Sequence, residues 1–311
     1  MRSQLRGGFG SRQADCVQAP SSAFRLWSTL AFLSCLALFN ACQLETKARE
    51  RAQRWPGAHW TETHRPKDLG WSPKGLAAVR AYADSIDTAA VVIVDDGIVV
   101  SQWGATTTKF DVHSIRKSFL SALYGIAVAK GQINLNSTLE ELRIDDNPPS
   151  LTAVEKQARV IDLLKGRSGI YHAALYESPA MKAEKPPRGS HPPRSYWSYN
   201  NWDVNALGTI YEQLTHNSIY QSFDVQVAQR IGMEDYDASE QQYVTGPDSI
   251  HRAYPFRMSA RHMARFGLLY LRGGRWRDAQ VILAQWVHDS TTAYSVADGN
   301  VRDHYSRYGY L

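Results

Sequence analysis

Cysteine is scarce in this 311-residue chain, and its distribution is uneven. The three cysteines, Cys16, Cys35 and Cys42, all lie within the first 42 residues. The rest of the chain can therefore hold neither a disulfide framework nor a cysteine-type zinc site. The ten histidines form no His-Glu-x-x-His or His-x-His pattern, so the common histidine metal motifs are missing as well. We expect an activity that needs no metal and no cofactor.

A large excess of one charge is also missing. The net charge is +5 with neutral histidines, and the first 42 residues supply +3 of it through four arginines and one aspartate. The remaining +2 gives no indication of a nucleic-acid-binding protein. Apolar side chains, in contrast, are abundant: 43% of residues are hydrophobic and 11% aromatic, which is enough for a large core in one domain or two interleaved ones.

The first 42 residues indicate an export signal. A basic stretch that ends at Arg25 precedes the mostly apolar run 26–39, and Asn40-Ala41-Cys42 follows. The apolar run is shorter than the roughly 20 residues that span a bilayer, but it fits the apolar region of a signal peptide. A small residue before a cysteine resembles the lipobox of bacterial lipoproteins, with Cys42 as the lipidated residue; an uncleaved signal anchor is the alternative. We expect an exported protein on the periplasmic face, lipid-anchored to a membrane through Cys42.

The segment after the leader suits a tether, because residues 43–70 are charged and include two prolines. Ser72-Pro73 then places a capping residue before a proline at the first helical position, which predicts a helix. Two β-rich runs, 89–94 and 98–103, flank Asp96-Gly97, and this arrangement predicts a hairpin.

A long helical stretch is predicted beyond the hairpin. Apolar spacing predicts a helix over 203–215, and Ser259 is a capping residue for another helix that runs to about Arg272. Arg257, Arg261 and Arg265 recur at every fourth position, which is typical of a solvated helix face.

The order of these elements predicts an α+β fold: an antiparallel sheet flanked by helices, with a helical subdomain beside it. We expect the chain to be divided as follows: a lipoprotein-type signal peptide (1–42), a tether (43–70) and one folded domain (71–311), whose α/β part comprises 71–113 and 255–311 and whose helical part comprises 114–254.

The motif Ser114-Ile115-Arg116-Lys117 lies where an extended, charged stretch gives way to the apolar run 119–126. On a helix, residues three apart share a face with Cβ atoms roughly 5–6 Å apart, so the lysine amine can reach the serine hydroxyl. A serine at a helix N-terminus also faces unpaired N–H groups and the positive end of the helix dipole, which favour a developing oxyanion. This pattern is typical of an activated serine nucleophile; a capping serine with a solvated lysine has the same spacing.

A second motif, Tyr199-Asn200-Asn201, lies in an aromatic stretch downstream. Together the two motifs resemble the Ser-x-x-Lys and Tyr-x-Asn motifs of the serine β-lactamase and penicillin-binding-protein superfamily, specifically its class C and esterase-like branch. The resemblance covers most of residues 70–311 and implies a β-lactamase/transpeptidase-like fold. Two further segments match: Asp162 to Ile170, similar to the family's LL-x-x-x-SG turn, and Ser259 to Gly274, similar to its S-x-x-D-x-ARFG helix, with His262 in place of the usual Asp.

The resemblance implies a catalytic role for each motif. Ser114 attacks an amide or ester carbonyl, Lys117 and Tyr199 take its proton and pass one to the leaving group, and Asn201 orients the substrate and Lys117. Water then hydrolyses the acyl-enzyme. A phenolate at pH 7 requires the pKa of the tyrosine to fall by about 3 units. One ammonium at about 4 Å supplies that order of energy at an effective dielectric near 20, so Lys117 and Tyr199 are both candidates for the base.

Aromatic residues are candidates for the substrate pocket. Tyr171, Tyr176 and Trp197 could line it, although packing beneath a loop is the alternative. The tyrosine-rich stretch 170–177 is more similar to esterases and amidases such as the 6-aminohexanoate-dimer hydrolases than to a true β-lactamase. We therefore expect an exported serine hydrolase that cleaves a small-molecule or peptide-like amide or ester. The alternative is a catalytically impaired lipoprotein that binds penicillin or peptidoglycan.

The family's third motif, Lys-Thr-Gly or His-x-Gly on a strand beside the serine, does not occur after Tyr199. The last lysine is Lys185, and the chain stops at Leu311, where the family enters its C-terminal strands. In the family that strand also donates an oxyanion-hole N–H, and the loss of one such donor costs about 10²–10³ in rate. We expect a truncated chain, without the C-terminal strands, that is catalytically impaired or inactive.

Overall fold

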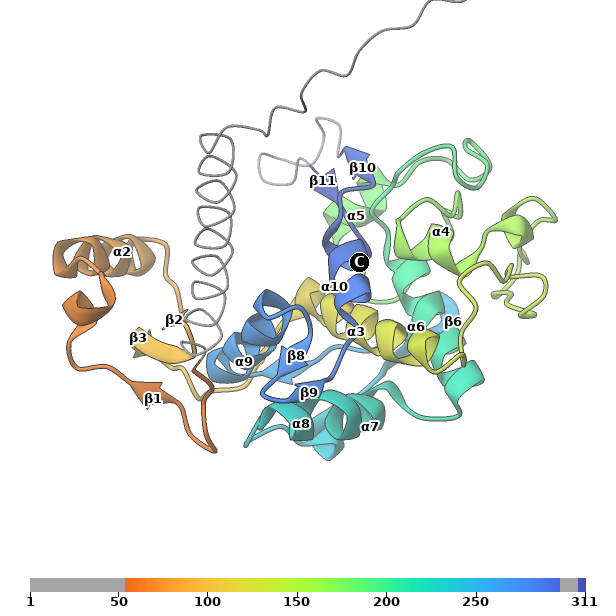
Figure 1. Ribbon diagram of the computed structural model, residues 1–311. Helices are drawn as coiled ribbons and strands as arrows, with labels where there is room; N and C mark the ends of the chain where they lie inside the picture. Colours follow the sequence, from red (N-terminus) through yellow and green to blue (C-terminus); the bar gives the residue numbers. More distant parts are fainter. Residues whose placement is uncertain (1–53, 297–306) are drawn as a thin grey trace, which may run out of the picture. The chain divides into compact units, whose positions relative to one another are not determined.

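The computed structural model describes residues 54–296 and 307–311 (Figure 1). The predicted signal peptide, Cys42 and the first part of the predicted tether lie outside the described residues. Among the residues that are described, no helix combines the length and the apolar character needed to cross a bilayer.

The hairpin predicted at Asp96-Gly97 is confirmed. Strand β2 (Ala90–Asp95) pairs antiparallel with β3 (Ile98–Gly104), with a register shift between Ile93 and Val94. The two turn residues both have positive φ, 44° at Asp96 and 77° at Gly97, as a two-residue type I′ turn requires. This turn matches the twist of the strands, so a local sequence signal is sufficient to form the hairpin.

Residues 54–70, part of the segment predicted as a tether, contribute to the sheet and to the core. Strand β1 (Thr61–Glu62) pairs in parallel with β3, which gives the strand order β1-β3-β2. The Trp60 side chain is buried, and its Nε1 donates to the carbonyl of Arg261 at 3.3 Å.

The other strands are short and pair antiparallel: β4 (Phe110–Asp111) with β7 (Arg257–Met258), β5 (Val244–Gly246) with β6 (Ser249–Ala253), β8 (Arg275–Trp276) with β9 (Ala279–Gln280), and β10 (Ser295–Val296) with β11 (Arg307–Tyr308). The α-helices are α2 (Pro73–Ser85), α3 (Arg116–Ala129), α4 (Val160–Leu164), α5 (Pro179–Glu184), α6 (Asn201–Thr215), α7 (Ile219–Phe223), α8 (Gln229–Ile231), α9 (Ala260–Leu271) and α10 (Ala284–Thr291). The remaining helical turns are η1 (Pro66–Leu69), η2 (His113–Ile115), η3 (Glu155–Gln157), the π-helical η4 (Asp224–Ala228) and η5 (Ala238–Glu240). Helices with small, mostly antiparallel sheets confirm the α+β prediction.

Helix α3 forms the centre of the core. It contacts α6, α7 and α10, which lie around it in Figure 1. Its residues are almost all buried, and the ring of Phe119 packs edge-on against Phe266 at 4.8 Å and 5.1 Å from Phe223. A Cβ at Gly125 would lie 2.4 Å from the indole of Trp286, so glycine allows the close approach of α10. Because α3 packs against several helices, the position of its first turn is fixed by the core.

The predicted caps also form. Ser72 accepts a hydrogen bond from the backbone of Gly75 at 3.2 Å, and Ser259 accepts one from His262 at 3.2 Å. Helix α6 begins at Asn201, two residues before the predicted start at 203, because the Asn200 side chain accepts from the backbone N–H of Asp203 at 2.9 Å.

The prediction of a solvated arginine face on α9 is wrong. Arg257 lies on β7 rather than on the helix, and Arg265 is only 2% exposed. The guanidinium of Arg265 donates to the carbonyls of Gly57, Ala58 and Ile231 at 2.8–2.9 Å. These acceptors are distant in sequence, so the four-residue spacing of the arginines could not indicate that one of them is buried.

Candidate active site

Ser114 lies in the helical turn η2, immediately before α3. The carboxylate of Asp111 accepts a hydrogen bond from the backbone N–H of His113 at 3.0 Å, and His113 has a left-handed φ of 46°. This turn ends β4 and directs the chain into the helix. The Ser114 side chain is exposed, whereas Lys117, one turn later, is buried.

Three predicted residues meet in one triangle of hydrogen bonds. Lys117 Nζ lies 2.9 Å from Ser114 Oγ and 2.6 Å from the Tyr199 hydroxyl. The Tyr199 hydroxyl lies 2.7 Å from Ser114 Oγ. Tyr199 is separated from Lys117 by 82 positions in the sequence, so the triangle is a product of the fold. Hydroxyl, amine and phenol are all within the reach that proton transfer requires.

Burial determines the charge state of Lys117. Burial first, and then the positive charge of Arg116, lower the pKa of Lys117 from 10.5 to about 6. The amine is therefore mainly neutral at pH 7, and its lone pair can accept a proton. The argument from sequence assumed a charged ammonium that shifts the pKa of the tyrosine. A neutral Lys117 supplies no such charge and is itself suited to be the base.

The segment before α6 holds Tyr199 in place. The backbone N–H of Ser198 donates to the carbonyl of Gly166 at 2.9 Å, and Asn200 caps α6 one residue after the tyrosine. Lys117 Nζ lies 4.5 Å from the centre of the Tyr199 ring, and the ring of Tyr308 packs edge-on against it at 6.1 Å. The Tyr199 ring is thus held by contacts with Lys117 and Tyr308.

Asn201 lies close to this triangle but has a different partner from the one predicted. Its side chain is 2% exposed, and Nδ2 donates to the carbonyl of Tyr176 at 2.5 Å. Its Oδ1 is buried without a hydrogen-bond partner among the described residues. Within the described chain, no hydrogen bond joins Asn201 to Lys117. The contact it makes fixes the turn at Tyr176, which has a left-handed φ of 65°.

The two other predicted pocket residues contact aromatic side chains. Trp197 packs against Tyr308 at 5.3 Å between ring centres, and Tyr308 also contacts Tyr199. Tyr171 is buried and meets His191 edge-on at 6.3 Å; burial raises its pKa to about 12.

Asp111 and His113, which come just before Ser114, were not singled out from the sequence. Both contact the predicted pocket residue Tyr176. Its hydroxyl donates to the carboxylate of Asp111 and lies 3.0 Å from Nδ1 of His113, and the His113 and Tyr176 rings stack. Burial, and then the bond to Asp111, raise the pKa of Tyr176 to about 12. The only signal was the position of Asp111 and His113 just before the nucleophile motif.

Asp203, on the helix that follows Tyr199, is a buried acid. Asp203 is 1% exposed, and its Oδ1 accepts a hydrogen bond from the Ser168 hydroxyl at 2.5 Å. Burial raises the pKa of Asp203 to about 8, so the carboxyl is mainly protonated at pH 7. This bond joins the turn at Ser168-Gly169, predicted from the family pattern, to the helix that follows Tyr199.

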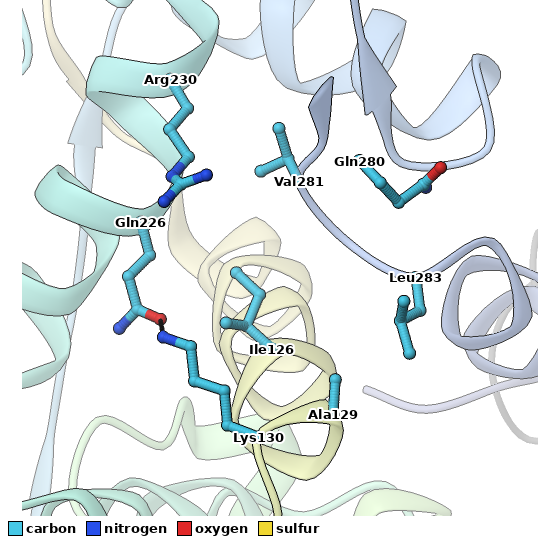
Figure 2. A pocket seen from close by; sticks show the side chains of 8 residues that line it. All are labelled: Ile126, Ala129, Lys130, Gln226, Arg230, Gln280, Val281 and Leu283. Carbon is cyan, nitrogen blue, oxygen red and sulfur yellow. Dashed lines mark hydrogen bonds between the residues drawn. The ribbon is translucent and has the colours of Figure 1, made fainter. Parts of the chain in front are cut away.

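A separate cavity of about 210 Å³ opens at the other end of α3. Figure 2 shows it between Ile126 and Ala129 on α3, Lys130 just after that helix, Gln226 and Arg230 on the neighbouring helical turns, and the segment that precedes α10. Lys130 is 13 positions beyond Lys117, about 20 Å along a helix, so this cavity is not part of the Ser114 site. Within the described residues, no group of three or more histidine, cysteine or acidic side chains could hold a metal ion.

Comparison with known proteins identifies the family and the fold. A family model described as Beta-lactamase matches residues 76–309. Because the match covers most of the chain, the protein belongs to the beta-lactamase family. Membership supports a serine-hydrolase type of function in general. Among curated proteins, none matches this chain.

Solved structures share the fold at low sequence identity. The octameric penicillin-binding protein homologue from Pyrococcus abyssi matches with a TM-score of 0.56 and 16% identity over 77% of this chain and 64% of its own, so this chain spans less than two thirds of its length. A candidate 6-aminohexanoate-dimer hydrolase from Bacillus anthracis has a TM-score of 0.54 and 20% identity over 77% and 68%. A candidate beta-lactamase from Bacteroides dorei has a TM-score of 0.56 and 15% identity over 77% and 78%. The predicted β-lactamase/transpeptidase-like fold is confirmed.

Proposed function

We propose that the protein is an exported serine hydrolase that cleaves an amide or ester through an acyl-serine intermediate, with Ser114 as nucleophile. The observation that supports this most strongly is the triangle of Ser114, Lys117 and Tyr199, with distances of 2.6–2.9 Å between the three polar atoms. A buried amine with a pKa near 6 can take a proton at neutral pH, which an ordinary exposed lysine cannot do.

The proposed reaction follows from these positions. Ser114 Oγ bonds to the carbonyl carbon while its proton passes to Lys117 Nζ, and the carbonyl oxygen takes up the negative charge. Collapse of this intermediate breaks the bond to the leaving group, which receives the proton through Lys117 or Tyr199. Water then attacks the acyl-enzyme and yields one proton to Lys117, which returns it to Ser114 as the acid leaves.

The start of α3 contributes to charge stabilisation in this mechanism. Ser114 directly precedes the first turn of a helix of 14 residues. The positive end of such a helix favours an oxyanion at the carbonyl that Ser114 attacks. The sequence has no Lys-Thr-Gly or His-x-Gly motif after Tyr199, so the helix end is the oxyanion stabiliser that we can name.

The surroundings of Ser114 favour a small ester or amide with an apolar or aromatic group. His113, next to Ser114 in the chain, stacks on Tyr176, and Tyr199, whose hydroxyl lies 2.7 Å from Ser114 Oγ, meets Tyr308 edge-on. One structural neighbour is named as a candidate 6-aminohexanoate-dimer hydrolase, an amide-cleaving enzyme by that name. We therefore place esterase or amidase activity ahead of β-lactam hydrolysis.

Export and membrane anchoring are part of the proposal. The basic stretch, the short apolar run and the Ala41-Cys42 junction support a lipidated N-terminus at Cys42. In cells that express the full chain, the protein is expected in the membrane fraction, and Cys42→Ala is expected to move it to the soluble fraction. An unchanged distribution would contradict lipid anchoring at Cys42.

The first test is the dependence of turnover on Ser114. The unaltered chain and Ser114→Ala are assayed with nitrocefin and with p-nitrophenyl esters. We expect ester cleavage to be lost in Ser114→Ala and kept in Ser121→Ala, which removes a hydroxyl from α3, the helix that follows Ser114. Equal background rates in all three proteins would contradict the hydrolase proposal. Stable labelling of Ser114 by fluorescent penicillin without turnover would instead favour a penicillin- or peptidoglycan-binding role.

A further inference from the structure

Arg116, the residue between the nucleophile and the base, has an unusual environment. Its side chain is 0% exposed. Nη2 donates to the side-chain oxygen of Asn205 at 3.0 Å, whereas Nε and Nη1 have no hydrogen-bond partner among the described residues. Within the described chain, no carboxylate lies within ion-pair distance of it. A buried positive charge is therefore held in place without a counter-ion.

Neutral groups occupy the positions where a carboxylate would be expected. The guanidinium lies 4.3 Å from the ring centre of Tyr254 and 5.6 Å from that of Tyr176. Asn205, which accepts the hydrogen bond from Nη2, donates in turn to the carbonyl of Leu175 at 3.0 Å. Ring faces and an amide fix the orientation of the guanidinium, but they do not cancel its charge.

The charge of Arg116 can act on Lys117 because no carboxylate is paired with Lys117 within the described chain. The side chains within hydrogen-bond distance of its amine are Ser114 and Tyr199, and Arg116 is the neighbouring charge on α3. From the adjoining elements, Asp111 is engaged by Tyr176 and the N–H of His113, and Asp203 is engaged by Ser168. No ion pair joins Lys117 to a carboxylate within the described chain, so no carboxylate offsets the charge of Arg116 there.

A buried charge without a partner is unfavourable for folding. An unbranched apolar side chain such as methionine would fill the same space between the rings without that cost. A role in packing alone therefore does not account for an arginine at this position. A role in electrostatics does, because a charge in a medium of low dielectric acts on its neighbours over several ångströms.

We propose that Arg116 is a positioning residue whose unneutralised guanidinium adds to the effect of burial and helps to keep the neighbouring Lys117 amine in the uncharged form that accepts the Ser114 proton. The inference rests on the proposed function of the same site and deepens it, because it assigns part of the readiness of the base to a residue outside the triangle of Ser114, Lys117 and Tyr199. Its action is through charge, so it depends on the cation and not on the exact shape of the side chain.

The test is a direct titration of Lys117 by NMR in protein labelled with ¹³C at the lysine ε-carbon, with Lys117→Met used to assign the signal. In Arg116→Met, the pKa of Lys117 is expected to rise by about one unit relative to the unaltered protein, because one nearby like charge has been removed. Arg116→Lys keeps a cation and is expected to bring the pKa back toward the original value. Arg116→Gln, which keeps a polar side chain, serves where Arg116→Met does not fold.

Arg265→Met is the matched control, because it removes another buried arginine from a different part of the chain. It is expected to leave the titration of Lys117 unchanged. An unaltered Lys117 pKa in both Arg116→Met and Arg116→Gln would overturn the proposal. An equal rise in Arg265→Met would also overturn it, because loosening of the fold would then explain the effect.

The titration does not require turnover, so the two proposals can fail separately. If Ser114 proves inactive while Lys117 responds to Arg116 as expected, the proposed hydrolysis fails and the electrostatic role stands. If turnover depends on Ser114, the acidic limb of kcat/KM against pH gives a second readout. That limb is expected to move up by about one pH unit in Arg116→Met, and its staying in place would contradict the role of Arg116.

Discussion

Two buried arginines, in two regions of the molecule, illustrate opposite uses of the same side chain. Arg265 on α9 donates to three backbone carbonyls at 2.8–2.9 Å and lies 3.4 Å from the carboxylate of Glu234. Arg116 at the start of α3 donates to one amide oxygen and leaves two nitrogens without partners among the described residues. Both side chains are at most 2% exposed, so burial alone does not distinguish them.

The difference separates an anchor from a functional charge. Arg265 satisfies backbone acceptors from residues 57–58 and from Ile231, and so joins three segments of the chain. At the start of α3, in contrast, two nitrogens of Arg116 are buried without partners among the described residues. Such atoms also occur elsewhere, for example His262 Nδ1 on α9, so the distinguishing feature of Arg116 is an unpartnered charge rather than an unpartnered polar atom.

The largest effect should come from removing the base. Lys117→Met is expected to lower kcat/KM for a p-nitrophenyl ester by about 10²–10⁴, because it removes the amine that lies 2.9 Å from Ser114 Oγ and is mainly neutral at pH 7. Lys130→Met, at the exposed end of the same helix, is the control and should keep the original rate. Similar losses in both variants would show that the comparison between a functional and a structural region does not hold for α3.

The second prediction sharpens the comparison of the two arginines through stability. Arg265→Met leaves three carbonyls without their donor and is expected to lower the free energy of unfolding by about 3 kcal/mol or more. Arg116→Met loses a single hydrogen bond and removes an unpaired charge, so its cost is expected to be about 1 kcal/mol or less. Urea denaturation followed by circular dichroism measures both. The reverse order of the two costs would contradict the account.

The third prediction extends the comparison to a buried acid. The folded-state pKa of Asp203 is raised to about 8, from about 3.9 in the unfolded chain, so the folded state binds more protons between these values. Stability therefore falls as pH rises through this window, by up to about 1.4 kcal/mol per pH unit. Asp203→Asn keeps the acceptor for Ser168 and is expected to remove that slope.

Lys117 contributes a slope of the opposite sign, because its lowered pKa makes stability rise with pH between about 6 and 10.5. The informative quantity is thus the difference between Asp203→Asn and the unaltered protein. This difference should be near zero at pH 4 and should favour the variant at pH 8.5. An equal difference at both pH values would show that Asp203 is ionised in the folded state.

Features that depend on neighbouring residues could be predicted from the sequence. The turn at Asp96-Gly97 and the caps at Ser72 and Ser259 need only local φ angles and short-range hydrogen bonds. The candidate partners Ser114 and Lys117 share a helical face for the same reason. Tyr199 was reached through resemblance to a family, since nothing local relates it to a residue 82 positions earlier.

Features that depend on burial could not be predicted. The neutrality of Lys117 arises from elements packed around α3, and the sequence alone suggested an ammonium. The partner of Asn201 is a carbonyl in the turn at Tyr176, 25 positions away, and the partners of Arg265 lie more than 200 positions away in residues 57–58. In each case a distant backbone segment determines what the side chain does.

The most direct test of the account is mass spectrometry of the protein mixed briefly with p-nitrophenyl acetate and quenched in acid. The account predicts one added acetyl group on the peptide that contains Ser114, absent in Ser114→Ala and formed more slowly as pH falls below about 6, where Lys117 takes up a proton. Acetylation of Lys117 itself, or an adduct that persists in Ser114→Ala, would contradict the claim that a neutral lysine activates this serine.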